Sequence, residues 1–213
     1  VAEGRAWPDE LAGDELAADV VVLAAGSASC GIGGLPPGLR LPVRPVKGQI
    51  LRLRPASGAA PQVLRRTVRA LVRGRDVYLV PRVDGEVVVG ATVEERGTDT
   101  TVTAGAVLDL LDDACEIVPT LREHELAECA AASRPGTPDN GPLVGPAEAG
   151  LVVATGHYRN GVLLSAFTAD AVLAAVRGDP LPQVWAPFAA DRFAVPAQPP
   201  LTGSPTINEE VPR

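Results

Sequence analysis

The chain has few aromatic residues, no methionine and no run of basic residues. Phe, Trp and Tyr together make up 3% of its 213 residues, whereas the hydrophobic fraction is 46%. That fraction is enough to bury the core of one large domain or two small ones, so a globular chain is expected. The formal net charge is -7, and arginines are scattered among the acidic residues. Such a surface repels a phosphate backbone, so no nucleic-acid partner is expected.

The sequence also lacks the cysteine pattern of a secreted or zinc-binding domain. Cys30, Cys115 and Cys129 are odd in number and widely spaced, which favours a reducing, cytoplasmic location. The most apolar stretch, residues 162–176, is too short to span a bilayer and contains Asp170,. The first residues lack the basic and then apolar pattern of a signal peptide. We therefore expect a soluble protein without a membrane partner.

Two short apolar runs predict buried strands of a parallel sheet. Residues 19–26 (DVVVLAAG) and 151–155 (LVVAT) are continuous and rich in β-branched residues, as in strands covered on both faces. A loop rich in glycine and proline follows the first run. An almost wholly apolar segment, 162–176, follows the second run and predicts a buried helix that stops at Gly178 and Pro180,.

The middle of the chain has a different pattern. From Gln49 onward, leucines alternate with arginines (LRLR, residues 51–54), which predicts a half-solvated antiparallel strand. Residues 77–82 and 86–92 flank a VDG turn and predict a hairpin,. Residues 104–118 predict an amphipathic helix whose acidic residues form a solvated face rather than a metal site.

The predicted fold class is α/β (α+β), in which one domain is left and re-entered. Residues 1–40 would be a remnant of an α/β domain to which residues 134–195 return. Residues 41–133 would form an inserted antiparallel-sheet domain. Residues 196–213 are rich in proline and predict a disordered tail.

Three segments carry candidate functional residues. The segment 156–161 (GHYRNG) joins a predicted strand to a predicted helix, where free backbone N–H groups favour a negative charge. An ordinary glycine-bounded connection explains the same pattern. Arg134 follows a run of small residues (AECAAAS) expected to be buried, and its planar fork suits a carboxylate; a solvated arginine before a turn is the alternative. Tyr78 is either a ligand of the same group or a core tyrosine. His124, in an acidic and helical-looking stretch, is expected at the surface.

Five segments, in this order and at these separations, resemble the carboxy-terminal half of the D-amino-acid oxidase superfamily. They are VVVLAAGSAS, PVKGQILRL, VYLVPRVDGEVVVGAT, SRPGTPDNGPLVG and GHYRNGVLLS. Within that superfamily the chain is most similar to the FAD-dependent glycine oxidases of thiamine biosynthesis. The resemblance covers residues 15 to 195 and implies part of an FAD-binding Rossmann-like domain with an inserted antiparallel-sheet substrate domain. It also implies oxidative deamination of glycine or a similar small amino acid, giving glyoxylate, ammonia and hydrogen peroxide.

The resemblance also implies roles for individual residues. Arg134 would grip the substrate carboxylate, Tyr78 would hydrogen-bond it, and Arg159 would lie close to flavin and substrate. Ala25 and Gly26 would lie near the flavin pyrophosphate. The backbone that would approach the flavin pyrimidine edge belongs to Gly156, His157, Tyr158, Arg159, Asn160, Gly161 and Val162.

The chain departs from the family pattern at three places. Ala28 replaces an aromatic residue, and Asp76 lies near the expected substrate pocket, where a carboxylate can alter the amine preference. No G-x-G-x-x-G turn follows a strand, because the GIGG run at 31–34 meets Pro36,. The amino-terminal nucleotide-binding half is therefore expected to be missing, as in a truncated product, a fragment or one half of a split enzyme with a partner chain. Such a chain alone is not expected to hold FAD tightly or to be active.

Other readings remain open at this stage. A serine hydrolase would use Ser29 with His124 or His157 as base, but the turn lacks the first glycine of a nucleophile elbow. A catalytically inactive binding or assembly module is the second alternative. An oxidase of another amine, such as sarcosine or a D-amino acid, is the third. The oligomeric state, including a homo-oligomer, stays open.

Overall fold

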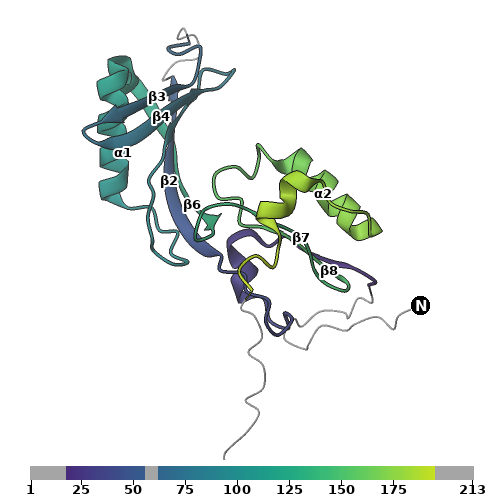
Figure 1. Cartoon of the computed structure of the whole chain (residues 1–213). Coiled ribbons are helices and arrows are strands. Elements are labelled where there is room, and N and C mark those ends of the chain that lie inside the picture. Colours follow the sequence, from purple (N-terminus) through teal and green to yellow (C-terminus); the bar gives the residue numbers. More distant parts are fainter. Residues whose placement is uncertain (1–17, 56–61, 195–213) are drawn as a thin grey trace, which may run out of the picture.

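The computed structural model describes residues 18–55 and 62–194, which form two sheets, each with a helix beside it (Figure 1). The predictions for residues 1–17 and for the tail at 196–213 lie outside the described residues. The mixed α/β class predicted from the sequence is confirmed. No helix in the described ranges is long and apolar enough to cross a membrane.

The larger sheet has five antiparallel strands in the order β3-β4-β5-β2-β6. Its strands are β2 (Arg44–Pro55), β3 (Val68–Val72), β4 (Arg75–Pro81), β5 (Val87–Gly90) and β6 (His124–Gly136). The predicted alternation in β2 is confirmed, because Leu51 and Leu53 are buried while Arg52 ion-pairs with Glu86 at 2.7 Å. The predicted hairpin is β4 and β5, and its turn contains Gly85 at φ 87°.

Helix α1 (Ala104–Ile117) covers one face of this sheet, as predicted, and begins at an N-cap made by Thr103. Its acidic residues are not all solvated, which corrects the sequence prediction. Asp113 is buried and accepts two hydrogen bonds from Arg75, at 2.8 Å from Nε and 2.5 Å from Nη2. A carboxylate can be buried here because a bidentate arginine satisfies both of its oxygens.

The smaller sheet has the order β1-β8-β7. Its strands are β1 (Val21–Leu23), β7 (Leu143–Glu148) and β8 (Leu151–Thr155). Strands β1 and β8 are parallel, as predicted, but β1 is shorter than the predicted run and 42% of Val22 is exposed. Within the described chain, β1 is therefore not covered on both faces.

Helix α2 (Ser165–Arg177) packs on the smaller sheet and ends at Gly178, which has φ 77°. The prediction of its C-terminus is confirmed, but the prediction that the whole apolar segment is buried is wrong. Only Thr168 and Ala171 of the helix are buried, and Ala171 packs against Val144 of β7. The exposed apolar residues of the segment are Val162, Leu163, Phe167, Leu173 and Val176. The described chain places neighbours on one side of this helix only.

Three short 3-10 helices complete the described part of the chain: η1 (Gly26–Gly31), η2 (Pro119–Glu123) and η3 (Gln183–Phe188). The stretch around His124 is not helical, which corrects the prediction. His124 begins β6, and its two ring nitrogens are buried without a hydrogen-bond partner in the described structure. The small residues before Arg134 are half-buried rather than buried, because β6 is an edge strand of the five-stranded sheet.

Strands β2 and β6 pair along their whole length, from Arg44 opposite Gly136 to Pro55 opposite His124. Figure 1 shows this pair running from the α1 side of the large sheet toward the small sheet. The large sheet thus spans residues 44–136, and β6 crosses the boundary predicted at 133. The division into domains stays a prediction.

The core of the large sheet gives a first test. Leu79 of β4 is fully buried, whereas Leu71 of β3 is 70% exposed. We expect Leu79→Ala to lower the free energy of unfolding by about 2 to 5 kcal/mol, because it removes buried methyl groups and leaves a cavity. Leu71→Ala is the matched control and should change it by less than about 0.5 kcal/mol. Urea denaturation measures both, and equal losses would contradict the assignment of the core.

Candidate substrate and flavin site

A cavity of about 530 Å³ lies where the large sheet meets the loop after β8. Its lining comes from β3, β4, the segment after β5, the end of β6 and that loop. The lining residues are Arg69, Ala70, Asp76, Val77, Tyr78, Ala91, Arg134, Tyr158, Arg159 and Asn160. The three residues expected to handle substrate, Tyr78, Arg134 and Arg159, therefore lie around one space.

The guanidinium of Arg134 lies directly over Gly48 of the neighbouring strand β2. A Cβ atom at Gly48 would come within 2.2 Å of Nη2 of Arg134, so no larger residue fits there without moving the arginine. The Nη1 group donates to the carbonyl of Thr92 at 3.2 Å and, more weakly, to that of Lys47 at 3.4 Å. The guanidinium also makes a side-chain hydrogen bond with Tyr78. An arginine carries more N–H donors than these contacts use, which leaves some for a ligand.

Arg134 is not the solvated arginine of the alternative reading. Burial lowers its pKa, and the positive charge of Arg159 lowers it further, whereas the hydroxyl of Tyr78 raises it. Three arginines line the cavity, Arg69, Arg134 and Arg159, and this excess of positive charge favours an anion there,. Asp76 also lines the cavity, so the surface is cationic with one acidic residue at its edge.

Tyr78 is placed by a second glycine. It lies opposite Gly90 in the β4–β5 ladder, and a Cβ atom at Gly90 would come within 2.5 Å of the tyrosine ring. The ring therefore lies flat over the neighbouring strand, and its side chain lines the cavity. Tyr78 is thus not enclosed in the core, although the residues on either side of it, Val77 and Leu79, are buried.

The loop after β8 reaches the end of β6. Gly156 has φ 76°, and Tyr158, which has φ 51°, donates its backbone N–H to the carbonyl of Pro135 at 3.0 Å. This bond places the loop beside Arg134. The guanidinium of Arg159 lies 5.4 Å from the ring centroid of Tyr158, within the range of a cation–π contact.

His157 does not join the cavity. Its Nε2 lies 2.9 Å from Oγ1 of Thr168 in α2, and burial lowers its pKa. Burial thus favours the neutral imidazole, and its contact with Thr168 ties the loop to the helix. Gly156, Gly161 and Val162 also lie outside the cavity lining, whereas Tyr158, Arg159 and Asn160 belong to it.

Ala25 and Gly26 lie on the same edge of the small sheet as the loop after β8, because β1 and β8 are parallel. The carbonyl of Gly26 accepts hydrogen bonds from the hydroxyls of Ser29 at 2.8 Å and Thr155 at 3.0 Å. Ser29 is fully buried and also contacts Thr155. It therefore holds a turn, and the structure offers no support for its use as a nucleophile.

The residues present at this edge fit a flavin. In the described structure, the backbone N–H groups of Gly161, Val162 and Leu163 have no acceptor, and 92% of Val162 is exposed. These residues lie in the turn that leads into α2, near the positive end of the helix dipole, which suits the electron-rich edge of a ring,. Ligands in sheets with parallel strands bind outside the carboxyl ends of those strands, where Gly26 and Gly156 lie. No group of metal-ligating residues occurs in the described ranges.

Two features of the cavity were missed by sequence reasoning. Arg69 lines it from β3, opposite Tyr78 in the ladder, and Ala91 follows β5. Arg69 faces the cavity because it pairs with Tyr78 across the β3–β4 ladder. The sequence alone does not show this pairing, because it depends on the strand register. Asp76, two residues before Tyr78 on the same face, was identified from the sequence.

The fold and site are those of a flavin-dependent oxidoreductase. The chain belongs to the family of FAD dependent oxidoreductases called DAO, whose family model matches residues 1–175. FAD is the cofactor of this family.

The chain is similar to several characterised members. It is 40% identical over 167 residues to a glycine oxidase of Pseudomonas putida, covering 76% of this chain and 43% of that protein. It is 36% identical over 159 residues to the hydrogen cyanide synthase subunit HcnC of Pseudomonas protegens, covering 74% of this chain and 36% of that protein. The chain thus spans less than half the length of these relatives.

A crystal structure of glycine oxidase from Geobacillus kaustophilus superposes with a TM-score of 0.73 and 33% sequence identity. The match covers 85% of this chain and 47% of that one. The sequence resemblance to the D-amino-acid oxidase superfamily, with glycine oxidases among the relatives, is confirmed.

The contact between Gly48 and Arg134 gives a second test. We expect Gly48→Ala to expel the guanidinium from the carbonyls of Lys47 and Thr92 while the fold persists, because a flexible side chain can rotate away. The loss of those hydrogen bonds should cost about 1 kcal/mol of stability. Gly33→Ala is the control, since Gly33 lies outside the helices and a Cβ atom there meets nothing within 4 Å. A crystal structure of Gly48→Ala with Arg134 in place would refute this account.

Proposed function

We propose that this chain supplies the substrate-binding face and part of the flavin-binding face of an FAD-dependent oxidase of glycine or a similar small amino acid. The observation that carries the proposal is the convergence of Tyr78, Arg134 and Arg159 on one cavity from three distant parts of the chain. A carboxylate is small enough to bridge a tyrosine hydroxyl and an arginine guanidinium, and both side chains occupy space that Gly48 and Gly90 leave open,. The 40% identity to a glycine oxidase supports the choice of substrate.

In this proposal the chain orients the substrate and shapes the field around it. The N–H groups of Arg134 that remain available bind the carboxylate, and the hydroxyl of Tyr78 donates to it. Holding the carboxylate fixes the position of the neighbouring carbon, which removes much of the entropic barrier to reaction. Arg159 adds positive charge on the side of the loop.

When bound, FAD would supply the acceptor for the hydride that leaves the substrate carbon. The N–H groups of Gly161, Val162 and Leu163 would hold its pyrimidine edge, and the turn at Ala25 and Gly26 would lie near its pyrophosphate. Such fixed donors stabilise negative charge without reorganisation. The oxidised substrate would leave as an imine, which water converts to glyoxylate and ammonia, and the electrons would pass to oxygen to give hydrogen peroxide.

The relatives leave the finer role to be decided by experiment. We propose thiamine thiazole synthesis as the pathway, on the likeness to glycine oxidases. The likeness to the hydrogen cyanide synthase subunit HcnC supports a second candidate role, as a subunit of a hydrogen cyanide synthase. Asp76 in the cavity lining favours an amine different from glycine, such as sarcosine or a D-amino acid. Rates with these amines, each compared with glycine, distinguish the candidates.

The cofactor provides a direct test. The 213 residues contain no G-x-G-x-x-G turn, so we propose that residues outside this chain, joined to it or in a partner, complete the pyrophosphate site. The chain expressed alone should therefore purify colourless, as judged by its visible absorbance spectrum. A stoichiometric flavin spectrum would contradict this. A chain that stays colourless and inactive with every flavin-binding partner would instead support an inactive binding or assembly module.

Removing the arginine tests the substrate. In the FAD-loaded enzyme, Arg134→Ala should raise the Michaelis constant for glycine far more than that for an amine without a carboxylate. The loss of a charge-assisted, bidentate contact should cost roughly 2 to 4 kcal/mol of binding free energy. Arg177→Ala, an exposed arginine in the last turn of α2, is the control and should change neither constant. Equal effects of Arg134→Ala on both substrates would show that Arg134 does not bind the carboxylate.

A further inference from the structure

Lys47 stands out because it is the only lysine among the 19 basic residues of the chain. Arginine serves at every other basic position, yet this one position keeps a compact ammonium. The side chain is also almost completely buried, with 1% of its surface exposed. Lysine is rarely buried in this way unless its charge is paired.

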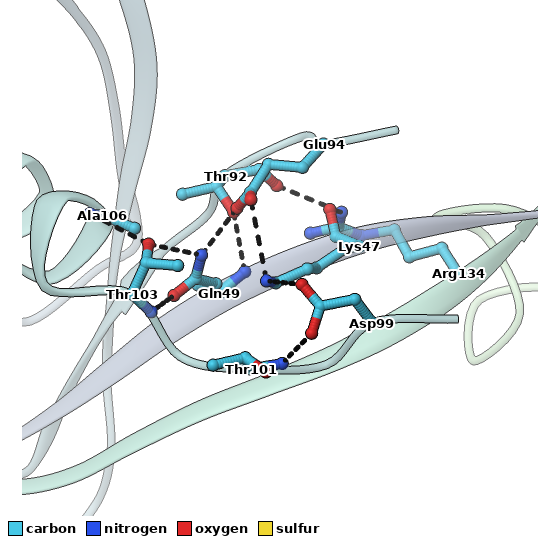
Figure 2. Close-up of polar contacts among 9 residues, drawn as sticks. All are labelled: Lys47, Gln49, Thr92, Glu94, Asp99, Thr101, Thr103, Ala106 and Arg134. Atoms are coloured by element: carbon cyan, nitrogen blue, oxygen red, sulfur yellow. Dashed lines mark hydrogen bonds and ion pairs between the residues drawn. The ribbon is translucent and has the colours of Figure 1, made fainter. Parts of the chain in front are cut away.

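The partners of Lys47 come from the segment between β5 and α1, residues 91–103, which we call the strap. The ammonium lies 3.1 Å from Oδ2 of Asp99 and 3.8 Å from Oε2 of Glu94. The backbones of Lys47 and Glu94 also exchange two hydrogen bonds, of 2.9 and 3.0 Å. Figure 2 shows these strap residues gathered around Lys47, with Arg134 reaching toward its backbone.

Gln49, two residues along β2, is a second anchor of the strap. Its amide nitrogen donates to Oε1 of Glu94 at 2.7 Å, and its side-chain oxygen accepts from the backbone N–H of Thr103 at 2.9 Å. Its backbone N–H donates to the hydroxyl of Thr92 at 2.9 Å. Gln49 is fully buried. The strap is thus held at its start, its middle and its end, where Thr103 caps α1.

Stability alone does not explain this cluster. The cost of desolvating a buried ion pair is commonly as large as its Coulomb energy, so such a pair is weak evidence for stabilisation. The strap itself is mostly exposed between residues 95 and 101, and it buries little apolar surface. What the cluster does fix is geometry: the carbonyls of Thr92 and Lys47 are the two acceptors of Arg134 Nη1.

We propose that Lys47 positions the guanidinium of Arg134 by pinning the strap to β2. The ion pair with Asp99 and Glu94 holds the strap against the strand, and the strap then presents the Thr92 carbonyl beside that of Lys47. Both carbonyls accept hydrogen bonds from Nη1 of Arg134, and this directs the rest of the guanidinium toward the cavity. Lys47 is a positioning residue and does not itself line the cavity. The role assigned to the fork rests on the proposed function, whereas the positioning of Arg134 can be tested without it.

The test follows the Arg134 side chain in the full 213-residue chain by NMR of isotope-labelled arginine Nε–H groups. Its signal is assigned by its disappearance in Arg134→Lys. In Lys47→Met we expect that signal to shift and broaden, because the guanidinium loses its fixed acceptors. Asp99→Asn, a milder change at a partly exposed partner, should give a smaller shift in the same direction and decides the question if Lys47→Met does not fold.

The matched control is Arg52→Met on the same strand, which removes a cation paired with buried Glu86. It should leave the Arg134 signal unchanged. Losing any ion pair from β2 would then not be sufficient to move Arg134, and the effect would be specific to Lys47 and the strap. An unchanged Arg134 signal in a folded Lys47→Met or Asp99→Asn variant would overturn the proposal.

Acetate, used as a simple carboxylate probe, links the positioning to binding. Lys47→Met should weaken acetate binding by about tenfold. At metal sites, removing the residue that orients a ligating side chain weakens binding by about tenfold or more, and we expect a similar effect here. In the Arg134→Lys background the same substitution should have no further effect, because coupled residues are not additive. Absence of acetate binding to the wild-type chain would count against the proposed carboxylate site, while the NMR signal would still decide the positioning.

Discussion

The pairing of β2 with β6 is the interaction on which the rest of the structure depends. Two segments whose paired residues lie 69 to 92 positions apart in sequence form one antiparallel ladder, from Arg44 with Gly136 to Pro55 with His124, with one register shift after Arg52. At one end this ladder belongs to the core under α1, and at the other it meets the loop after β8 through the bond from Tyr158 to Pro135. Arg134 lies near that second end. The ladder therefore decides that a residue of the large sheet and a loop of the small sheet share one cavity.

Close approach between neighbouring strands then fixes the side chains of the cavity. Gly48 and Gly90 provide room for the guanidinium of Arg134 and the ring of Tyr78 to lie across the sheet. A cation placed in this way loses water, and burial accordingly lowers the pKa of Arg134. Its charge is held by backbone carbonyls rather than by a carboxylate. Arg134 can therefore still bind a carboxylate ligand. A salt bridge to a carboxylate of the protein itself would have used the same N–H groups.

Local patterns in the sequence were sufficient for most elements. The alternation in β2, the turn at Asp84 and Gly85 in the hairpin and the glycine that ends α2 were all identified, because each depends on a few neighbouring residues. The errors arose where burial depends on distant contacts. Asp113 was expected in solvent but is paired with Arg75, and the helix expected to be buried exposes Val162 and Leu163. No spacing in the sequence reveals which surface a distant strand will cover.

The sequence by itself determined the class of the fold, the family and the residue types that could bind a carboxylate, since these are carried by short motifs such as SRPGTPD and GHYRNG. The family resemblance already implied that Tyr78, Arg134 and Arg159 share one site. Only the tertiary structure decided that Arg69 joins them in the lining of one cavity and that His157 turns away toward Thr168. It also decided that the single lysine is buried beneath the strap. The physical reason is that strand register sets which side chains face one another, and register is a property of paired strands rather than of either strand alone.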